Sequence, residues 1–148
     1  MISRQYIAGL IDGDGCIGTT YAPPNQKFRQ KSPIIQTRVS LGSTCLSILK
    51  IFQKQYGGAI HKRQGFISKN WKCFYMWIIT SRKAMTFLKE ITPFLFIKKP
   101  VGKYLLRNER YFQRNCKGGY GVRVPPKILQ KRLEIHKWCC HFNKPGKN

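Results

Sequence analysis

Two aspartates stand two positions apart near the start of the chain, and the 148-residue sequence contains no others. Asp12 falls at the end of an apolar helical pattern, whereas Asp14 lies between two glycines, a context typical of a tight turn. A carboxylate there can hold a divalent cation that bridges to a phosphate, or it can hydrogen-bond to the backbone of the turn. The residues alone leave both roles open. Asp14 is the better candidate for a metal ligand, and Asp12 for a structural hydrogen bond.

The net charge of the chain indicates which class of partner it binds. The 28 Lys and Arg residues stand against 5 Asp and Glu residues, a formal charge of +23, and a polyanion relieves such self-repulsion. Nucleic acid is therefore the expected partner, with an anionic membrane surface and a ribosome as the alternatives. A hydrophobic share of 42% indicates a folded domain rather than a disordered basic tail. No apolar run approaches the roughly 20 residues that span a bilayer, so we expect no membrane insertion.

The amino terminus and the cysteines bear on the compartment. No signal peptide or cleavable transit peptide is recognised, so we expect an intracellular protein, encoded within a chloroplast or mitochondrion if it works in one. None of the six cysteines forms a C-x-x-C pair, which favours reduced thiols. A zinc site would be built on His136 and Cys140, one helical turn apart. The missing paired spacing favours ordinary packing for these residues over zinc binding.

Apolar periodicity predicts one α+β domain over residues 1–148. Helices are expected near residues 4–13, 44–56, 81–91, 100–112 and 125–142, and strands near 16–22, 34–41, 58–63 and 71–79. The order is αββαββα, with further helices after it. We therefore expect an antiparallel four-stranded sheet with helices on one face, a core over about residues 3–112 and a C-terminal helical extension over about 113–142.

The other face of the sheet is the candidate binding surface. In the strand 34–41, Ile35, Thr37, Val39 and Leu41 alternate with polar or basic residues, which separates an apolar face from a polar one. In the strand 71–79 both alternating sets are apolar or aromatic, so the alternation does not select a face. A basic sheet face can enter the major groove of DNA. The candidate residues on this face are Gln36, Arg38, His61, Arg63, Tyr75 and Trp77.

The first predicted helix contains two glycines, although glycine is a poor helix former. Gly9 and Gly13 are four residues apart and therefore share one helical face. Two small residues stacked in this way permit another backbone to approach closely. They indicate tight packing of a second helix against this face.

Residues 6–18 read Tyr-Ile-Ala-Gly-Leu-Ile-Asp-Gly-Asp-Gly-Cys-Ile-Gly. This segment resembles the signature of the LAGLIDADG homing endonucleases, with seven of the nine motif letters in agreement. The run 92–99 also resembles a segment of that family. The resemblance implies the family fold, in which the four-stranded sheet forms a DNA-binding saddle.

The resemblance also implies a function. Such a protein is a site-specific double-strand DNA endonuclease of intron homing that hydrolyses phosphodiester bonds with Mg²⁺, which Mn²⁺ or Ca²⁺ can replace in binding. Because the motif occurs once, the implied enzyme is a homodimer on a pseudo-palindromic target. The alternatives are a non-catalytic nucleic-acid module on the same fold, such as an RNA maturase, and a basic ribosomal protein. Leu41 and Cys45 stand where better-known homodimeric members carry a Gln and an Arg.

Particular residues receive roles from the resemblance. Asp14 would bind Mg²⁺ near the scissile phosphate, assisted by the backbone carbonyl of Gly13. Lys98 would be the basic catalytic residue that flanks this site. The first helix would form the subunit interface at Gly9, Asp12 and Gly13. The residues facing DNA would be Gly18, Thr20, Gln36, Arg38, His61, Arg63, Tyr75 and Trp77.

Overall fold

A computed structural model describes residues 2–63, 73–112 and 123–144. In chain order the elements are α1 (Arg4–Asp14), β1 (Gly15–Ala22), β2 (Ile34–Ser43), α2 (Leu46–Tyr56), β3 (Ala59–Arg63), β4 (Phe74–Thr80), α3 (Ser81–Ile91), α4 (Lys99–Arg107) and α5 (Pro126–Phe142). Short 3₁₀ turns are η1 (Gln26–Phe28), η2 (Thr92–Phe94) and η3 (Glu109–Phe112). The first two residues of the strand predicted at 71–79, and residues 113–122 of the predicted C-terminal extension, lie outside the described residues.

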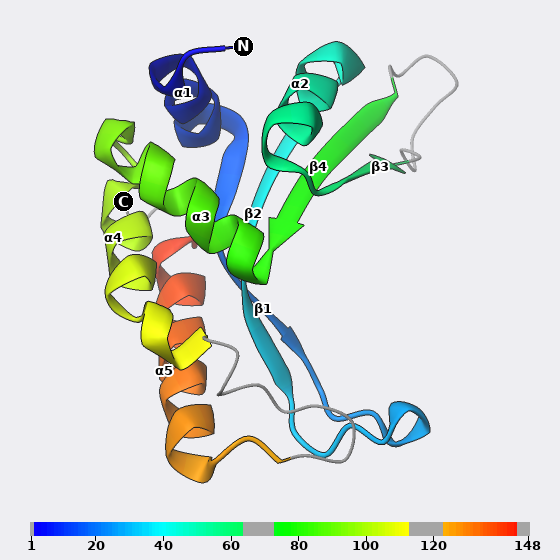
Figure 1. The fold of residues 1–148 in the computed structure, drawn as a ribbon, viewed down its shortest axis with the longest axis vertical. Helices are drawn as coiled ribbons and strands as arrows, with labels where there is room; N and C mark the ends of the chain where they lie inside the picture. Colours follow the sequence, from blue (N-terminus) through cyan, green and yellow to red (C-terminus); the bar gives the residue numbers. More distant parts are fainter. Residues whose placement is uncertain (1, 64–72, 113–122, 145–148) are drawn as a thin grey trace.

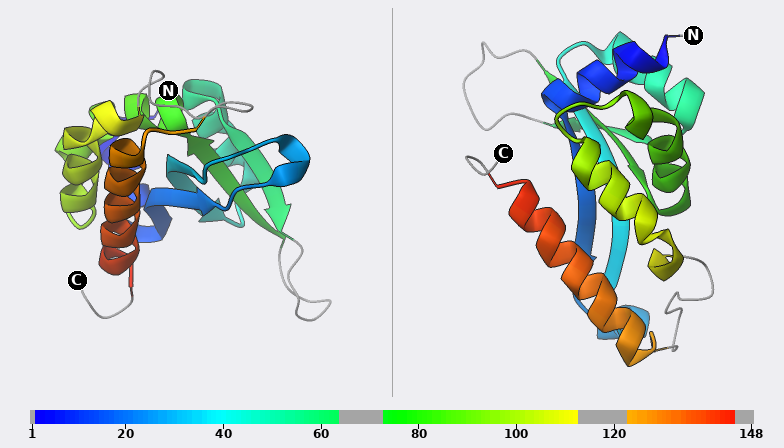
Figure 2. Two further views of the ribbon diagram at one scale, coloured as in Figure 1. Left: turned by 90° about the horizontal axis from the view of Figure 1, so that it is seen from below. Right: turned by 90° about the vertical axis from the view of Figure 1, so that its left-hand side faces the viewer.

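The four strands form one antiparallel sheet in the order β1-β2-β4-β3. Helices α1 to α4 gather on one side of this sheet, and α5 runs obliquely past its β1 edge (Figures 1 and 2). The predicted α+β architecture and the αββαββα order of its first seven elements are confirmed. Of the helices in the described segments, none combines the length and the apolar character needed to cross a bilayer.

The core lies between the sheet and these helices. The apolar set predicted in β2 does face the helices: Ile35 is 3% exposed, and Val39 is fully buried. The helices supply the opposing layer through Ile7 and Ile11 of α1 and Phe87 of α3, among others. The opposite face of the sheet therefore carries the alternate residues of each strand and has no helix layer over most of its width.

The structure assigns the two faces of β4, which the sequence left undecided. Trp77 is fully buried on the helix side, with its ring 5.1 Å from Phe52 and 5.6 Å from Phe87. Its indole N–H donates to the carbonyl of Gly57 at 2.8 Å. Tyr75 points to the same side and packs against the core. The prediction that Tyr75 and Trp77 face DNA is therefore wrong, because both rings serve the hydrophobic core.

Candidate functional site

The motif segment ends α1 and turns directly into β1. Ser3 caps the start of the helix, its hydroxyl accepting from the N–H of Tyr6 at 3.2 Å. The helix runs to Asp14, and β1 begins at Gly15. A Cβ at Gly15 would lie 2.8 Å from the backbone of Ile11, so only glycine fits this turn. The two aspartates are thereby held at the carboxyl end of α1, where the helix dipole disfavours negative charge.

Asp12 holds the segment after η2 against this helix end. Its carboxylate accepts from the N–H of Phe96 at 2.6 Å and from the N–H of Lys98 at 2.8 Å. Both donors are more than eighty residues away in sequence. Asp12 therefore has the structural hydrogen-bonding role that its sequence context favoured. Its predicted contribution to a subunit interface stays a prediction.

Lys98 is positioned by the same contact. Its ammonium donates to the carbonyl of Ile11 at 2.9 Å and also to the carbonyl of Asp12. A cation at a helix carboxyl end stabilises the partial negative charge of the last carbonyls. Lys98 thus lies beside the last backbone carbonyls of α1, and its role as the basic catalytic residue stays a prediction.

Asp14 differs from the other acids of the chain, all of which lie in the described residues. Glu90, Glu109 and Glu134 each form an ion pair, with Arg4, Lys89 and Lys131 respectively. The Asp12 carboxylate is occupied by two N–H groups. The side chain of Asp14 is exposed and has neither an ion pair nor a hydrogen bond with a described residue. A free carboxylate at a helix carboxyl end is unfavourable unless a cation joins it.

The surroundings of Asp14 fit a hydrated divalent cation better than an enclosed one. The carbonyl of Gly13, one of the last four of α1, has no donor within the helix and can supply a second oxygen ligand. No group of three or more His, Cys, Asp or Glu side chains among the described residues could form a metal cage. Mg²⁺ commonly binds through one or two carboxylates, water and substrate phosphates, which matches this sparse set of ligands.

The two carboxylates should respond differently to substitution, and stability measurements can show this for Asp12. Asp12→Asn is expected to lower the free energy of unfolding by about 1.5–3 kcal/mol, the range for hydrogen bonds to a charged group. The melting temperature should fall by about 2–4 °C for each kcal/mol. Glu134→Gln is the matched control, because it removes only an exposed ion pair, which solvent screening leaves with little effect on stability. Equal melting temperatures for the two variants would contradict the role of Asp12.

The open face of the sheet collects five of the polar residues predicted there. The register pairs Thr20 with Gln36 across β1 and β2. It also places His61 and Arg63 of β3 on this face, opposite Met76 and Phe74 of β4. The open-face residues that agree with the sequence prediction are Thr20, Gln36, Arg38, His61 and Arg63. Contact of these side chains with DNA stays a prediction.

Two arginines of the open face contact Met76, which was not among the predicted site residues. The guanidinium of Arg38 lies 3.6 Å from the sulfur of Met76, and that of Arg63 lies 3.8 Å from it. The side chains reach Met76 from the strands on either side of β4. Nearby, Ser81 donates its hydroxyl hydrogen to the side-chain oxygen of Gln36 at 2.7 Å. The centre of the open face is thus a basic surface with an apolar floor.

Gly18 was also predicted to face DNA, and the structure contradicts this. Gly18 is buried, and a Cβ there would lie 3.1 Å from the amide nitrogen of Asn143. That amide donates to the carbonyl of Ile17 at 2.9 Å, so the end of α5 covers this part of β1. A groove of about 420 Å³ runs between the end of α5 and the open face, with Arg38 and Cys140 among its lining residues. No local sequence pattern predicts this contact, because Asn143 and Ile17 are more than 120 residues apart.

His136 and Cys139 of α5 pack against β1. His136 shares a 2.8 Å hydrogen bond with the hydroxyl of Thr19, and its ring stacks on Tyr21 at 5.8 Å. Cys139 is 1% exposed, and burial raises the pKa of its thiol to about 12. Cys140 lies 3.6 Å from the ring of His136. These contacts hold α5 on the edge strand, and the preference for packing over zinc binding at His136 and Cys140 stays a prediction.

Leu41 and Cys45 contribute no polar group to the Asp14 site. Leu41 is 2% exposed in the core and pairs with Gly15 across β1 and β2. Cys45 is exposed at the start of α2, and a hydrogen bond with Ser47 lowers the pKa of its thiol. Desolvation raises the pKa of the Cys16 thiol, and the positive charges of Arg38 and Lys98 partly oppose this shift. Leu41 and Cys45 therefore add no hydrogen-bonding group to the backbone carbonyls and Lys98 at the end of α1.

The glycine face of α1 is uncovered. Gly9 and Gly13 are exposed, and a Cβ at either position would meet no atom within 4 Å. Large apolar side chains are exposed on the same helix and on the segment that Asp12 holds against it. These exposed side chains are Tyr6 at 53%, Phe94 at 42%, Phe96 at 88% and Ile97 at 52%. An apolar surface of this kind marks an interaction site.

The fold matches solved homing endonuclease structures over nearly the whole chain. I-CvuI, solved in complex with its target in the presence of Ca, aligns with a TM-score of 0.74 and 17% identity, covering 98% of this chain and 84% of that one. The archaeal intron-encoded I-Vdi141I, complexed with DNA, aligns at 0.71 and 16% identity, with 98% and 86% covered. I-TnaI aligns at 0.64 and 17% identity, with 95% of each chain covered. No family model and no curated protein sequence matches the chain.

These likenesses establish the architecture: the chain has the fold of the LAGLIDADG homing endonucleases. It contains that fold once. The meganuclease I-SmaMI aligns at a TM-score of 0.66 and 10% identity, and 98% of this chain then covers only 46% of that one. This chain is thus equivalent to one half of the larger protein.

Proposed function

We propose that this chain is a site-specific double-strand DNA endonuclease of intron homing, which hydrolyses phosphodiester bonds as a homodimer with Mg²⁺. The observation that carries the proposal is the state of Asp14. It is exposed, without an ionic partner among the described residues, and fixed by the Gly15 turn beside Lys98. A carboxylate that the fold presents in this way is suited to hold a cation against a phosphate.

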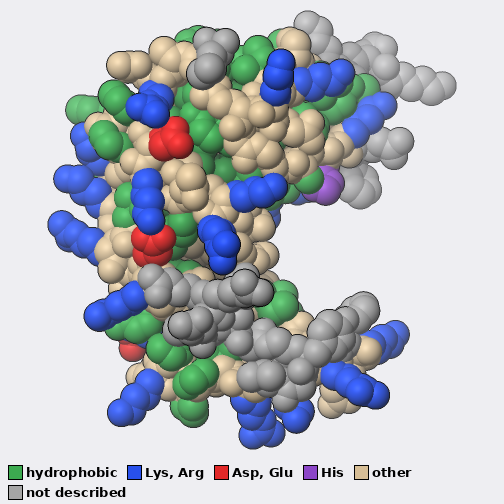
Figure 3. Space-filling view, viewed as in Figure 1, with side chains coloured by type: hydrophobic (Ala, Val, Ile, Leu, Met, Phe, Trp, Pro, Cys, Tyr) green, Lys and Arg blue, Asp and Glu red, His purple; other side chains and the backbone are tan. Residues whose placement is uncertain are grey.

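The charge of the molecule supports DNA as the substrate. Lys and Arg side chains are spread over the face shown in Figure 3, where acidic side chains are few and the outline is hollowed on one side. Arg38, His61 and Arg63 place further basic groups on the open sheet face. A two-stranded ribbon fits the major groove, where Arg and Gln side chains can read base edges. The solved neighbours I-CvuI and I-Vdi141I are complexes with DNA.

The geometry at the end of α1 supports the proposed catalytic roles. Asp14 and the Gly13 carbonyl would hold Mg²⁺, which when bound stabilises charge on the reacting phosphate and activates water. Lys98 keeps α1 and the segment after η2 together, and its positive charge would stabilise the charge that develops on the same phosphate. One chain supplies one such site. Cleavage of both strands therefore requires two chains related by a two-fold axis.

Cleavage assays with controlled metal content test the proposal. The full chain with Mg²⁺ should linearise a plasmid that carries the uninterrupted form of the gene in which its reading frame is inserted. Chelation by EDTA should abolish cutting, and added Mg²⁺ should restore it. Binding of the same duplex should persist in Ca²⁺. Cutting that continues in EDTA would exclude the metal role, and failure to cut this locus with Mg²⁺ would exclude the homing nuclease.

A further inference from the structure

Two exposed cysteines line the groove between the end of α5 and the open sheet face. Cys16 comes from β1, and Cys140 comes from the last turn of α5. The groove has a volume of about 420 Å³, and its lining also includes Thr20 and Arg38, which were predicted to contact DNA. A covalent link between the two sulfurs would therefore cross the groove beside residues of the proposed DNA-binding surface.

The end of α5 lies close to β1 where these cysteines stand. A Cβ at Gly18 would lie 3.9 Å from the Cβ of Cys139, the neighbour of Cys140. Side chains alternate along a strand, so Cys16 shares the open face with Gly18. Desolvation raises the pKa of the Cys16 thiol, and the nearby Cys140 thiol raises it further. A disulfide between a helix and a strand requires a close approach of this kind, because its Cα atoms lie within about 7 Å.

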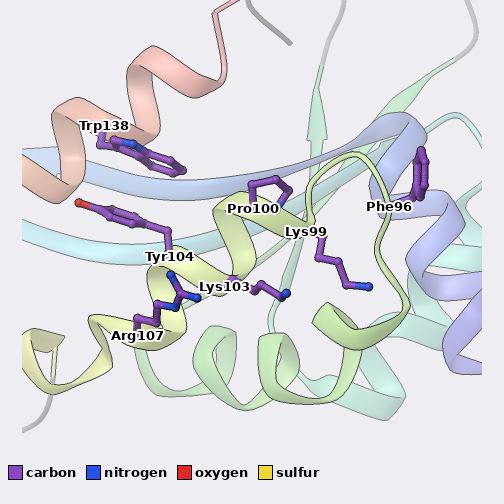
Figure 4. A pocket seen from close by; sticks show the side chains of 7 residues that line it. All are labelled: Phe96, Lys99, Pro100, Lys103, Tyr104, Arg107 and Trp138. Carbon is purple, nitrogen blue, oxygen red and sulfur yellow. The ribbon is translucent and has the colours of Figure 1, made fainter.

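Contacts on two sides fix the position of α5. The Asn143 amide donates to the carbonyl of Ile17 at 2.9 Å, which ties the end of the helix to β1. On the side facing α4, the ring of Trp138 stacks on that of Tyr104 with the centroids 4.0 Å apart (Figure 4). A helix held in this way keeps the Cys140 thiol beside the open face.

Cys140 is the thiol of this group that is best placed to react first. Its sulfur lies 3.6 Å from Nε2 of His136, whose Nδ1 shares a 2.8 Å hydrogen bond with the Thr19 hydroxyl. In the tautomer that donates Nδ1–H to this hydroxyl, Nε2 can accept the thiol proton. Cys139 is buried, and desolvation raises the pKa of its thiol to about 12, so it stays protonated and unreactive.

We propose that Cys140 and Cys16 form a reversible disulfide when the protein meets hydrogen peroxide. The Cys140 thiolate attacks the peroxide, whose O–O bond breaks to give a sulfenic acid and, with the thiol proton, one water. The Cys16 sulfur then attacks the sulfenic sulfur. The S–O bond breaks, the S–S bond forms, and the departing hydroxide leaves as a second water with the Cys16 proton. The two sulfurs are oxidised, the peroxide is reduced, and a dithiol reverses the reaction.

The bridge changes the surface that the open face presents to DNA. It crosses the groove beside Arg38 and ties β1 to α5, so a phosphate backbone can no longer enter there. The oxidised protein therefore binds duplex DNA more weakly than the reduced protein. This consequence rests on the proposed DNA-binding function, whereas formation of the disulfide does not.

Mass spectrometry tests the disulfide without DNA. Peroxide should lower the mass of the full chain by about 2 Da, and a non-reducing peptide map should join Cys16 to Cys140. Cys140→Ser should prevent this bridge, whereas Cys16→Ser should leave a sulfenic acid on Cys140 that dimedone traps. The matched control is Cys45→Ser, which removes an exposed thiol outside the groove and should leave the bridge intact. A bridge between other cysteines, or dimedone labelling confined to other cysteines, would overturn the proposal.

Fluorescence anisotropy with a labelled duplex in Ca²⁺ tests the consequence. Peroxide should weaken binding by the wild type roughly tenfold, which corresponds to the loss of one charge-assisted contact, and dithiothreitol should restore it. Cys140→Ser should bind equally well before and after peroxide. Equal affinities of the bridged and reduced wild type would refute closure of the groove. A reduced protein that binds no duplex would refute the proposed nuclease instead and would leave the peptide map unaffected.

Discussion

Replacing Asp14 with asparagine is expected to lower the rate of DNA cleavage about 1000-fold, because metal-assisted charge stabilisation supplies several kcal/mol and each 1.36 kcal/mol is a factor of ten. Affinity for the duplex should stay within a few-fold, since one exposed charge changes and the sheet face does not. Without metal the melting temperature should stay the same or rise slightly, because the Asp14 side chain makes no hydrogen bond or ion pair with the described residues and its charge lies at a helix carboxyl end. Cleavage of a labelled duplex under single-turnover conditions measures the effect.

Two comparisons make the Asp14 result specific. Asp12→Asn changes the same functional group two residues away, and its principal effect should appear in stability rather than in the intrinsic rate of the folded enzyme. Mixed dimers of wild-type and Asp14→Asn chains retain one complete site, so they should nick a plasmid rather than linearise it. If Asp14→Asn cut at the wild-type rate, the metal role would be refuted. An RNA maturase without nuclease activity would show splicing stimulation that survives the change.

The sequence predicts which face of β2 is buried, but it does not predict this for β4. In β2 the two alternating sets differ in polarity, and the burial of Val39 opposite the more accessible Gln36 and Arg38 follows the prediction. In β4 both sets are apolar, so polarity carries no information about which one faces the helices. Trp77 enters the core because Phe52 and Phe87 come from helices on that side. The positions of Phe52 and Phe87 depend on the three-dimensional fold, so the residues of β4 alone do not predict them.

In the candidate site, too, contacts between distant segments could not be predicted from the sequence. Lys98 was predicted as a basic residue near the motif. The contacts of its ammonium with the Ile11 and Asp12 carbonyls could not be predicted, because they join segments more than eighty residues apart in the sequence. The burial of Gly18 depends on Asn143, which lies farther still along the chain. Local spacing therefore identified the carboxylates and the α1 glycines. Contacts between distant segments decided which neighbouring residues are accessible.

Gly9→Leu is expected to abolish dimerisation while leaving the subunit folded. A Cβ at Gly9 meets no atom within 4 Å, and leucine is a better helix former than glycine by about 0.8 kcal/mol. In a two-fold dimer packed on this face, the larger side chain would clash twice. Overpacking costs about 1–3 kcal/mol at each site, so the dimer should weaken by about 2–6 kcal/mol. Sedimentation analysis at several concentrations measures the shift from dimer to monomer.

The cleavage consequence of Gly9→Leu follows from the number of active sites. A monomer carries one Asp14, so double-strand cleavage should disappear at concentrations where the dimer is lost and return partly as the concentration rises. Gly9→Ala is the graded control, because a single methyl group permits closer approach of two helices than leucine does. The exposed Phe94 and Ile97 should become protected from solvent in the wild-type dimer alone. A Gly9→Leu protein that stays dimeric and cuts normally would place the subunit interface elsewhere, and it would separate the role of the motif glycines from that of Asp14.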